Sequence, residues 1–125
     1  MQKCTIGLLM FAMLGMTWGA TQATAASHMA AGKQLYEQRC GPCHGNDGKA
    51  NTPTAKALKP APRDHTDGAY MNKLSNDHLY KVIKQGGTAV GKSAIMPPQA
   101  DLSDAQIQNI IAFVRSIAQP PYKGN

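Results

Sequence analysis

The clearest hydrophobic pattern lies near the C-terminal end of the chain. Apolar side chains recur there at intervals of three and four residues, at Ile107, Ile110, Ile111, Val114 and Ile117. This spacing predicts an amphipathic helix with one buried face. Ser103, followed three residues later by Gln106, is typical of a capping box at the start of such a helix, and Pro120-Pro121 predicts its end. We expect this helix to build the core rather than to carry chemistry.

A second helix is predicted in the middle of the chain. It begins near Ser75 and places apolar side chains on one face, at Leu79, Val82 and Ile83. Gly86-Gly87 is a usual signal for the end of a helix.

A third helix is predicted from about Met29 into Cys40, with Gly32 and Tyr36 four residues apart on one face. Glycine inside a helix costs about 1 kcal/mol relative to alanine, so Gly32 needs a packing reason. We expect the C-terminal helix to cross at Gly32, with Ile110 and Phe113 against Tyr36.

The segment between Gly45 and Leu74 is rich in Gly, Pro, Asn and Asp, and we expect at most one short helical turn in it, around Asp67 to Lys73. A loop of this length is unusual in a small domain. A cofactor that the loop encloses would account for it.

The first 25 residues resemble a secretory signal peptide. Lys3 precedes an apolar run from Ile6 to Gly19, and Ala23-Thr24-Ala25 supplies the small residues that signal peptidase recognises. An uncleaved anchor over Thr5 to Ala20 is the alternative, which glycines in the run weaken. Ser27-His28-Met29 resembles a cloning junction. We therefore expect residues 1–25 to be removed with Cys4 and residues 30–125 to form one domain.

Without Lys3, 12 basic and 7 acidic side chains remain, a formal charge of +5. The basic residues are scattered, which argues against nucleic acid as a partner and fits acidic redox proteins. Outside the expected signal peptide the aromatic residues are Phe113 and four tyrosines, so side chains alone supply little of a core. A bound cofactor would supply the rest.

The candidate chemistry lies in Cys40-Gly41-Pro42-Cys43-His44. Two cysteines three positions apart place two thiols on one turn, where they can add to the two vinyl groups of a haem. His44 then lies under the iron as its proximal ligand. The chain holds one such motif, which predicts one haem c per chain.

Two other interpretations of the motif are weaker. Cys-Gly-Pro-Cys also occurs in thioredoxin-like disulfide oxidoreductases, but there the motif follows a strand, and here it follows a predicted helix. A structural zinc site needs four ligands, usually in paired clusters, and the chain has no second Cys-x-x-Cys.

Over the whole mature chain the sequence resembles the class I c-type cytochromes. The resemblance rests on Gly32-x-x-x-Tyr36 before Cys-x-x-Cys-His, Gly45 after it, a late Met-Pro pair and a C-terminal helix with Phe113. It implies a small all-α fold in which three to four helices wrap one covalently attached haem.

The resemblance also implies that the sixth iron ligand is Met96, which precedes Pro97-Pro98 in a late loop. A thioether raises the reduction potential relative to a second histidine. Met71, His65 and His78 are the alternatives, although methionine is more often core filler than ligand and both histidines have polar neighbours.

The resemblance further implies a proline carbonyl that accepts the free N–H of the proximal imidazole. Pro53 lies at the closest comparable distance from His44, with Pro60 and Pro62 as alternatives. Candidate partners for the haem propionates are Arg63, Tyr70 and Lys73.

We therefore expect a periplasmic, monomeric electron carrier rather than an enzyme, without stable membrane insertion after signal cleavage. Acidic redox partners, themselves periplasmic or membrane-bound, would dock at a haem edge flanked by some of Lys49, Lys56, Lys59, Lys81, Lys84 and Lys92. The alternatives are a haem enzyme or gas sensor with a labile sixth ligand, and a thiol oxidoreductase that uses Cys40 and Cys43.

Overall fold

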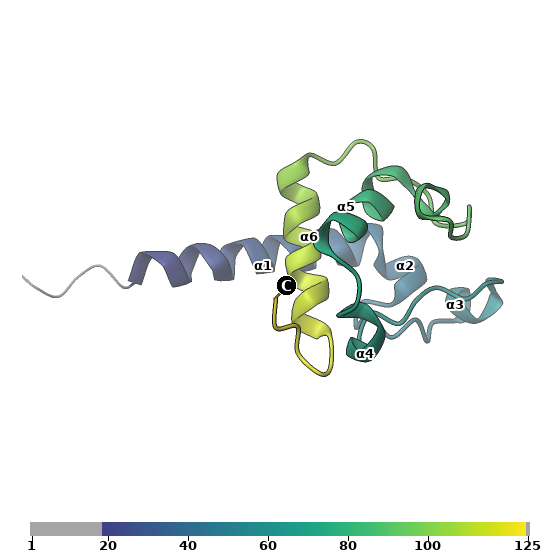
Figure 1. The fold of residues 1–125 in the computed structure, drawn as a ribbon, viewed down its shortest axis with the longest axis horizontal. Coiled ribbons are helices and arrows are strands. Elements are labelled where there is room, and N and C mark those ends of the chain that lie inside the picture. Colours follow the sequence, from purple (N-terminus) through teal and green to yellow (C-terminus); the bar gives the residue numbers. More distant parts are fainter. Residues whose placement is uncertain (1–18, 125) are drawn as a thin grey trace, which may run out of the picture.

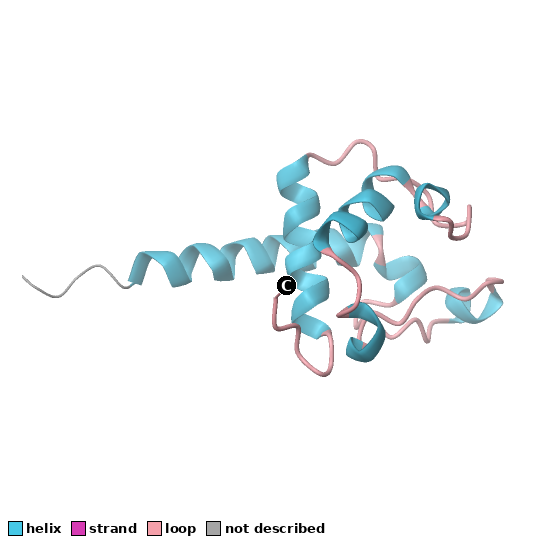
Figure 2. Cartoon of the chain, viewed as in Figure 1, coloured by secondary structure: helices cyan, strands magenta, loops and turns pink. Residues whose placement is uncertain are grey.

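The computed structural model describes residues 19–124, with side chains from residue 24 onward, and in this range the chain forms helices and loops without a strand (Figure 2). The order is α1 (Gly19–Arg39), α2 (Gly41–His44), α3 (Pro53–Ala57), α4 (Gly68–Met71), α5 (Asn76–Gln85), the 3-10 helix η1 (Gly87–Val90) and α6 (Asp104–Ile117). The all-α prediction is confirmed. The expected helices correspond to α1, α5, α6 and the short turn α4, and the structure adds α2, α3 and η1.

The domain is organised by the crossing of α1 and α6 (Figure 1). At Gly32 the two helix backbones are in direct contact, because a Cβ atom added there would overlap the Asn109 carbonyl of α6. The Tyr36 ring lies 5.0 Å from the Phe113 ring, centroid to centroid, and both Tyr36 and Ile110 are fully or almost fully buried. The crossing predicted at Gly32 is confirmed.

The start of α6 is held as its sequence predicts. Ser103 Oγ accepts a hydrogen bond from the Gln106 backbone N–H, and the Gln106 side chain accepts one from the Ser103 backbone N–H. The apolar face of α6 is buried, and each fully buried aliphatic side chain contributes about 1.5–3 kcal/mol. This helix supplies much of the core around which the site is built.

Helix α5 also agrees with its prediction. Ser75 Oγ accepts a hydrogen bond from the His78 backbone N–H, and the helix ends at Gly86, whose φ of 82° few other residues adopt readily. Leu79 and Ile83 face the core. The 3-10 helix η1 follows and leads into the loop that carries Met96.

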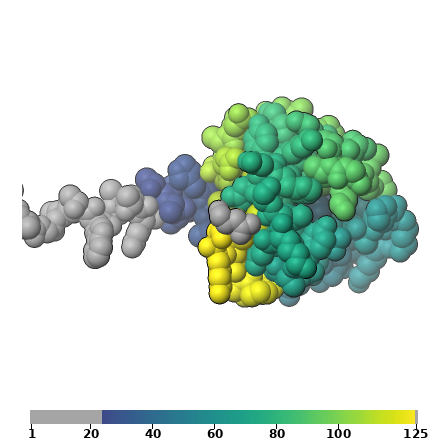
Figure 3. All heavy atoms as spheres, viewed as in Figure 1, coloured from purple at the N-terminus to yellow at the C-terminus, as the bar shows by residue number. Residues whose placement is uncertain are grey.

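Helix α1 is longer than predicted. It begins at Gly19 rather than near Met29, because the alanine-rich segment before Met29 favours helix and holds no internal glycine or proline. Residues 24–31 are exposed, and this part of α1 projects from the domain (Figure 3). Most of the expected signal peptide lies outside the described residues, so its removal stays a prediction. Residues 27–29 lie within α1, which does not test whether they are a cloning junction, and the domain boundary also stays a prediction. Among the described residues, no helix is long and apolar enough to cross a membrane.

The loop between α2 and α4 contains a short helix that the sequence analysis missed. Thr52 Oγ1 caps α3 by accepting a hydrogen bond from the Ala55 backbone N–H, and Pro53 occupies the first turn. Thr-Pro is a helix-start signal that could have identified it. Further along the loop, the His65 backbone N–H donates to Gly48 O at 2.7 Å, and the Gln119 N–H donates to Thr66 O at 2.9 Å. The loop is therefore fixed to itself and to the segment that follows α6.

Candidate functional site

The Cys40–His44 motif forms a single tight turn, made of the short helix α2 and Cys40, which joins it to α1. The His44 backbone N–H donates to Cys40 O at 2.8 Å, which places Cys40, Cys43 and His44 on one turn of chain. Both thiols are free and half-buried, and His44 is 8% exposed. All three side chains line a cavity of about 320 Å³, a size usual for a ligand or cofactor site.

The other walls of this cavity are largely apolar and come from distant parts of the chain. Its aliphatic lining residues include Leu79, Val82 and Ile83 of α5 and Ile110, Ile111 and Val114 of α6. Met96 lines the cavity from the loop after η1. That loop is fixed to α5 and its C-terminal end, because the Gly87 N–H donates to Met96 O at 3.0 Å and the Gln99 N–H donates to Ile83 O at 2.9 Å. The structure thus brings Met96 to the same cavity as the Cys40–His44 turn.

The orientation of the His44 ring is fixed by a main-chain carbonyl. His44 Nδ1 lies 2.9 Å from Arg63 O. A carbonyl oxygen only accepts, so Nδ1 carries the hydrogen and Nε2 keeps its lone pair, as an iron ligand requires. The expectation that the Pro53 carbonyl has this role was wrong, as were the alternatives Pro60 and Pro62, because the carbonyl that lies within hydrogen-bond distance of His44 Nδ1 belongs to Arg63. Pro53 lies instead in the first turn of α3.

The electrostatics of the turn favour metal ligation over thiol chemistry. Burial lowers the pKa of His44 below its usual value, against a smaller opposing effect of its hydrogen bond to Arg63, which favours the neutral imidazole. Burial, with a smaller contribution from Cys43, raises the pKa of Cys40 to about 11. A nucleophilic thiol of the thioredoxin type needs a lowered pKa. The arrangement therefore argues against a dithiol oxidoreductase.

Two of the alternative sixth ligands occupy other roles. His65 would not supply a second ligand to an iron held by His44, because its ring stacks on the His44 ring, with centroids 4.1 Å apart and planes 17° apart. Burial, and then the charges of His44 and Arg63, lowers the pKa of His65 to about 3, so this ring is neutral. Met71 is fully buried and packs in the core cluster. His78 is half-buried and lines the cavity from the first turn of α5.

Among the candidate propionate partners, Arg63 and Tyr70 lie together. The Arg63 guanidinium sits 3.8 Å from the centroid of the Tyr70 ring, and both residues line the cavity. Lys73 is exposed and is not among the residues that line the cavity. Arg63 therefore contributes twice to the site, with its carbonyl towards His44 and its side chain on the cavity wall.

Two features of the structure have no recognisable signal in the sequence. One is the stack of His65 on His44, which depends on the path of the loop between α2 and α4. That loop brings Arg63 and His65, about 20 residues after His44, back to the His44 ring. The other is Lys84, which was expected at a docking surface but donates from Nζ to Leu102 O at 2.6 Å and to Ala100 O at 3.2 Å. Lys84 is therefore held by the structure that precedes α6.

The all-helical fold and the Cys-x-x-Cys-His turn under an apolar cavity define a class I c-type cytochrome domain. Comparison with known families identifies the family within this class. The chain belongs to the family described as cytochrome c oxidase, cbb3-type, subunit III, whose model matches residues 27–114.

Individual proteins show the same relationship. The chain is 30% identical over 102 residues to the cbb3-type cytochrome c oxidase subunit FixPc of Rhizobium leguminosarum bv. viciae, and 29% identical to subunit FixP of Rhizobium etli. In both cases 80% of this chain matches 32% of the relative, so the chain spans about a third of their length. A chain of the reducing HAO-like protein complex of Kuenenia stuttgartiensis has a similar fold, with a TM-score of 0.61 and 25% identity over 71% of this chain and 42% of that one.

The cofactor of this class is a c-type haem, and the residues present fit it. Two free thiols lie on the cavity wall, a neutral imidazole keeps its Nε2 lone pair, and aliphatic side chains line the remaining space. No group of three or more His, Cys, Asp or Glu side chains between residues 24 and 124 could hold a separate metal ion.

Proposed function

We propose that this chain is a one-electron carrier whose haem iron is bound axially by His44 and Met96. The observation that carries the proposal is that these two side chains line one apolar cavity, with the free Nε2 of His44 assured by the Arg63 carbonyl. In this arrangement Cys40 and Cys43 hold the haem covalently, so it cannot dissociate.

The residues around the iron favour electron transfer over substrate chemistry. The haem supplies reversible one-electron oxidation and reduction. His44 is held by the Arg63 carbonyl, and Met96 by the main-chain hydrogen bonds that tie its loop to the end of α5. Pro97 and Pro98 stiffen the same loop, so that less chain entropy is lost in holding the thioether in place. With His44 and Met96 both bound to the iron, no position on it would be open to a substrate.

The relatives suggest the setting. The matched relatives are named as subunits of cbb3-type oxidases, and this chain covers about a third of their length. We infer that the chain exchanges electrons with membrane-bound or other periplasmic redox proteins after export, as a monomer. The predicted signal peptide at residues 1–25 supports export.

We expect a redox partner to dock beside the cavity, where exposed lysines of this chain supply positive charge. Five of the six candidate lysines are exposed, namely Lys49, Lys56, Lys59, Lys81 and Lys92. Lys92 also lines the cavity and precedes Met96 by four residues. An acidic partner would be steered towards this side, because complementary charge raises association rates.

The test is the optical spectrum of the reduced, periplasmically matured protein before and after addition of carbon monoxide. We expect a low-spin c-type spectrum that carbon monoxide leaves unchanged. A Soret band that shifts on addition would mean an open sixth position and would move the proposal to a haem enzyme or gas sensor. Absence of any Soret band would overturn haem binding itself.

A further inference from the structure

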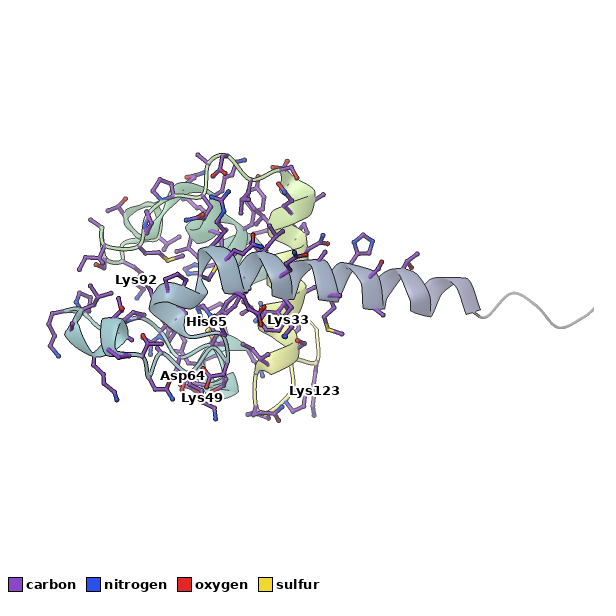
Figure 4. All side chains as sticks on the ribbon, turned by 180° about the vertical axis from the view of Figure 1, so that it is seen from behind. Lys33, Lys49, Asp64, His65, Lys92 and Lys123 are labelled. Atoms are coloured by element: carbon purple, nitrogen blue, oxygen red, sulfur yellow. The ribbon has the colours of Figure 1, made fainter. Side chains whose placement is uncertain are left out.

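The proximal imidazole is in contact with a second histidine ring whose position is itself fixed. His65 lies almost parallel to His44, with ring centroids 4.1 Å apart. His65 belongs to the loop between α2 and α4 and is among the side chains labelled in Figure 4. Its backbone is tied by the hydrogen bond from its N–H to Gly48 O.

The His65 ring is held by Tyr36. Tyr36 Oη and His65 Nδ1 are 2.8 Å apart, and the two rings meet edge to face at 5.7 Å. Tyr36 is fully buried and packs against Phe113 of α6. A continuous series of rings therefore runs from α6 through α1 and the loop after α2 to the proximal histidine.

This series supplies a constraint that the Arg63 carbonyl lacks. A single hydrogen bond at Nδ1 restrains rotation of the His44 ring about its Cβ–Cγ bond only loosely, because a carbonyl oxygen accepts over a broad range of directions. A flat neighbour against the face of the ring restrains the same rotation more closely. Stacked aromatic pairs contribute about 0.5–1.5 kcal/mol beyond the area they bury, which is enough to favour one orientation.

We propose that His65, held by Tyr36, is a positioning residue that fixes the plane of the His44 imidazole and thereby tunes the electronic structure and reduction potential of the haem. The inference rests on the proposed function, since it requires His44 to be the proximal ligand. The plane of an axial imidazole determines how its orbitals overlap with those of the iron. Its alignment with Arg63 O also determines how basic the ligand is.

The test uses His65→Leu, which removes the flat face, together with His65→Phe and Tyr36→Phe, which both remove the Tyr36–His65 hydrogen bond but keep the rings. The readouts are the spread of the four haem methyl signals in the proton NMR spectrum of the oxidised protein, its EPR g-values, and the midpoint potential. His28→Leu is the matched control, because it makes the same substitution at an exposed histidine of α1 that lies outside the cavity and contacts Asn109 rather than His44.

We expect His65→Leu to change the methyl spread and the g-values, and to raise the midpoint potential, because a less well aligned His44 is a weaker donor to the oxidised iron. His65→Phe and Tyr36→Phe should give smaller and matching changes in the same direction, and the double variant should add nothing to either. His28→Leu should leave the methyl spread unchanged.

An unchanged methyl spread and potential in His65→Leu would overturn the proposal, as would an equal change in His28→Leu. If His65→Leu fails to mature, the pair of Phe variants decides: matching changes support the proposal and no change in either overturns it. A wild-type protein without the signals of an iron-bound imidazole would overturn the proposed function and this inference together, whereas a normal wild type with unresponsive variants would overturn this inference alone.

Discussion

Gly32 of α1 lies directly against the main-chain carbonyl of Asn109 in α6, with no room for a Cβ atom between the two helices. This contact sets how closely α1 and α6 approach. The approach in turn places Tyr36 of α1 beside Phe113 and positions the Cys40–His44 turn that follows α1.

Gly32→Ala is therefore expected to destabilise the protein although alanine favours helix. Helix propensity would add about 1 kcal/mol of stability. Forcing a methyl group against a backbone carbonyl costs about 3 kcal/mol, the upper end of the usual range for overpacking, since a backbone atom cannot move aside as a flexible side chain can. We expect a net loss of about 2 kcal/mol in the free energy of unfolding, measured by denaturant titration.

The neighbouring substitution Ala31→Gly provides the control, because Ala31 is exposed in the same helix. It should cost about 1 kcal/mol through helix propensity alone. A Gly32→Ala variant more stable than the wild type would contradict the close contact of α1 and α6.

Arg115 of α6 holds the segment that connects α4 to α5. Its guanidinium donates to Met71 O at 2.7 Å and to Leu74 O, and its Nε donates to Asn76 Oδ1 at 3.0 Å. Met71 and Leu74 both line the cavity. Arg115 thus fixes one wall of the site from behind.

Arg115→Leu should lower the free energy of unfolding by about 3 kcal/mol or more, because each hydrogen bond to a charged group contributes about 1.5–3 kcal/mol and the carbonyls would be left unpaired. The three contributions do not add in full, since they share one side chain. Arg115→Lys keeps the charge but cannot reach all three acceptors, so its loss should be intermediate. The measurement is denaturant unfolding followed by circular dichroism. Wild-type stability in Arg115→Leu would show that these three bonds are dispensable.

The elements with local sequence signals were predictable. Ser75 and Ser103 cap α5 and α6 through hydrogen bonds that span three residues, and these patterns do not depend on the rest of the fold. Gly32 was informative for a different reason, since an otherwise unfavourable glycine within a helix indicated the crossing of α1 and α6. The haem-binding motif was likewise contained in five consecutive residues.

The features that were missed depend on the path of the loop between α2 and α4. Sequence distance from His44 suggested the carbonyl of Pro53, but the chain first forms α3 and then returns, so that Arg63 O reaches Nδ1. The stack of His65 on His44 follows from the same return. Periodicity and spacing carry no information on where an irregular loop comes back to the core.

Lys92 gives a test of the expected docking face. Lys92→Glu should slow reduction by an acidic protein donor roughly three- to tenfold at low ionic strength, because it reverses a charge at the cavity mouth. The difference should disappear as salt screens the charges. Stopped-flow kinetics over a salt series measures both effects.

Lys123→Glu is the matched control, since it makes the same charge change at an exposed residue far from Lys92 (Figure 4). Its effect on the rate should be much smaller. Equal effects of the two substitutions would mean that net charge, and not a docking face beside Met96, governs the encounter.

Met96 and Met71 both line the cavity, and replacing each in turn separates an iron ligand from a core residue. Met96→Ala should open the sixth position, so that carbon monoxide shifts the Soret band of the reduced protein. Its midpoint potential should fall by on the order of 0.1–0.2 V, because loss of a thioether ligand removes preferential stabilisation of the reduced iron, and axial ligands set potentials over a range of about 0.8 V.

Met71 is fully buried, so Met71→Leu should cost less than about 1.5 kcal/mol of stability and leave the carbon monoxide response and the potential unchanged. If Met71→Leu opened the iron to carbon monoxide and Met96→Ala did not, the ligand assignment would have to pass to Met71; if neither did, His78, the remaining candidate on the cavity wall, would be the residue to replace next.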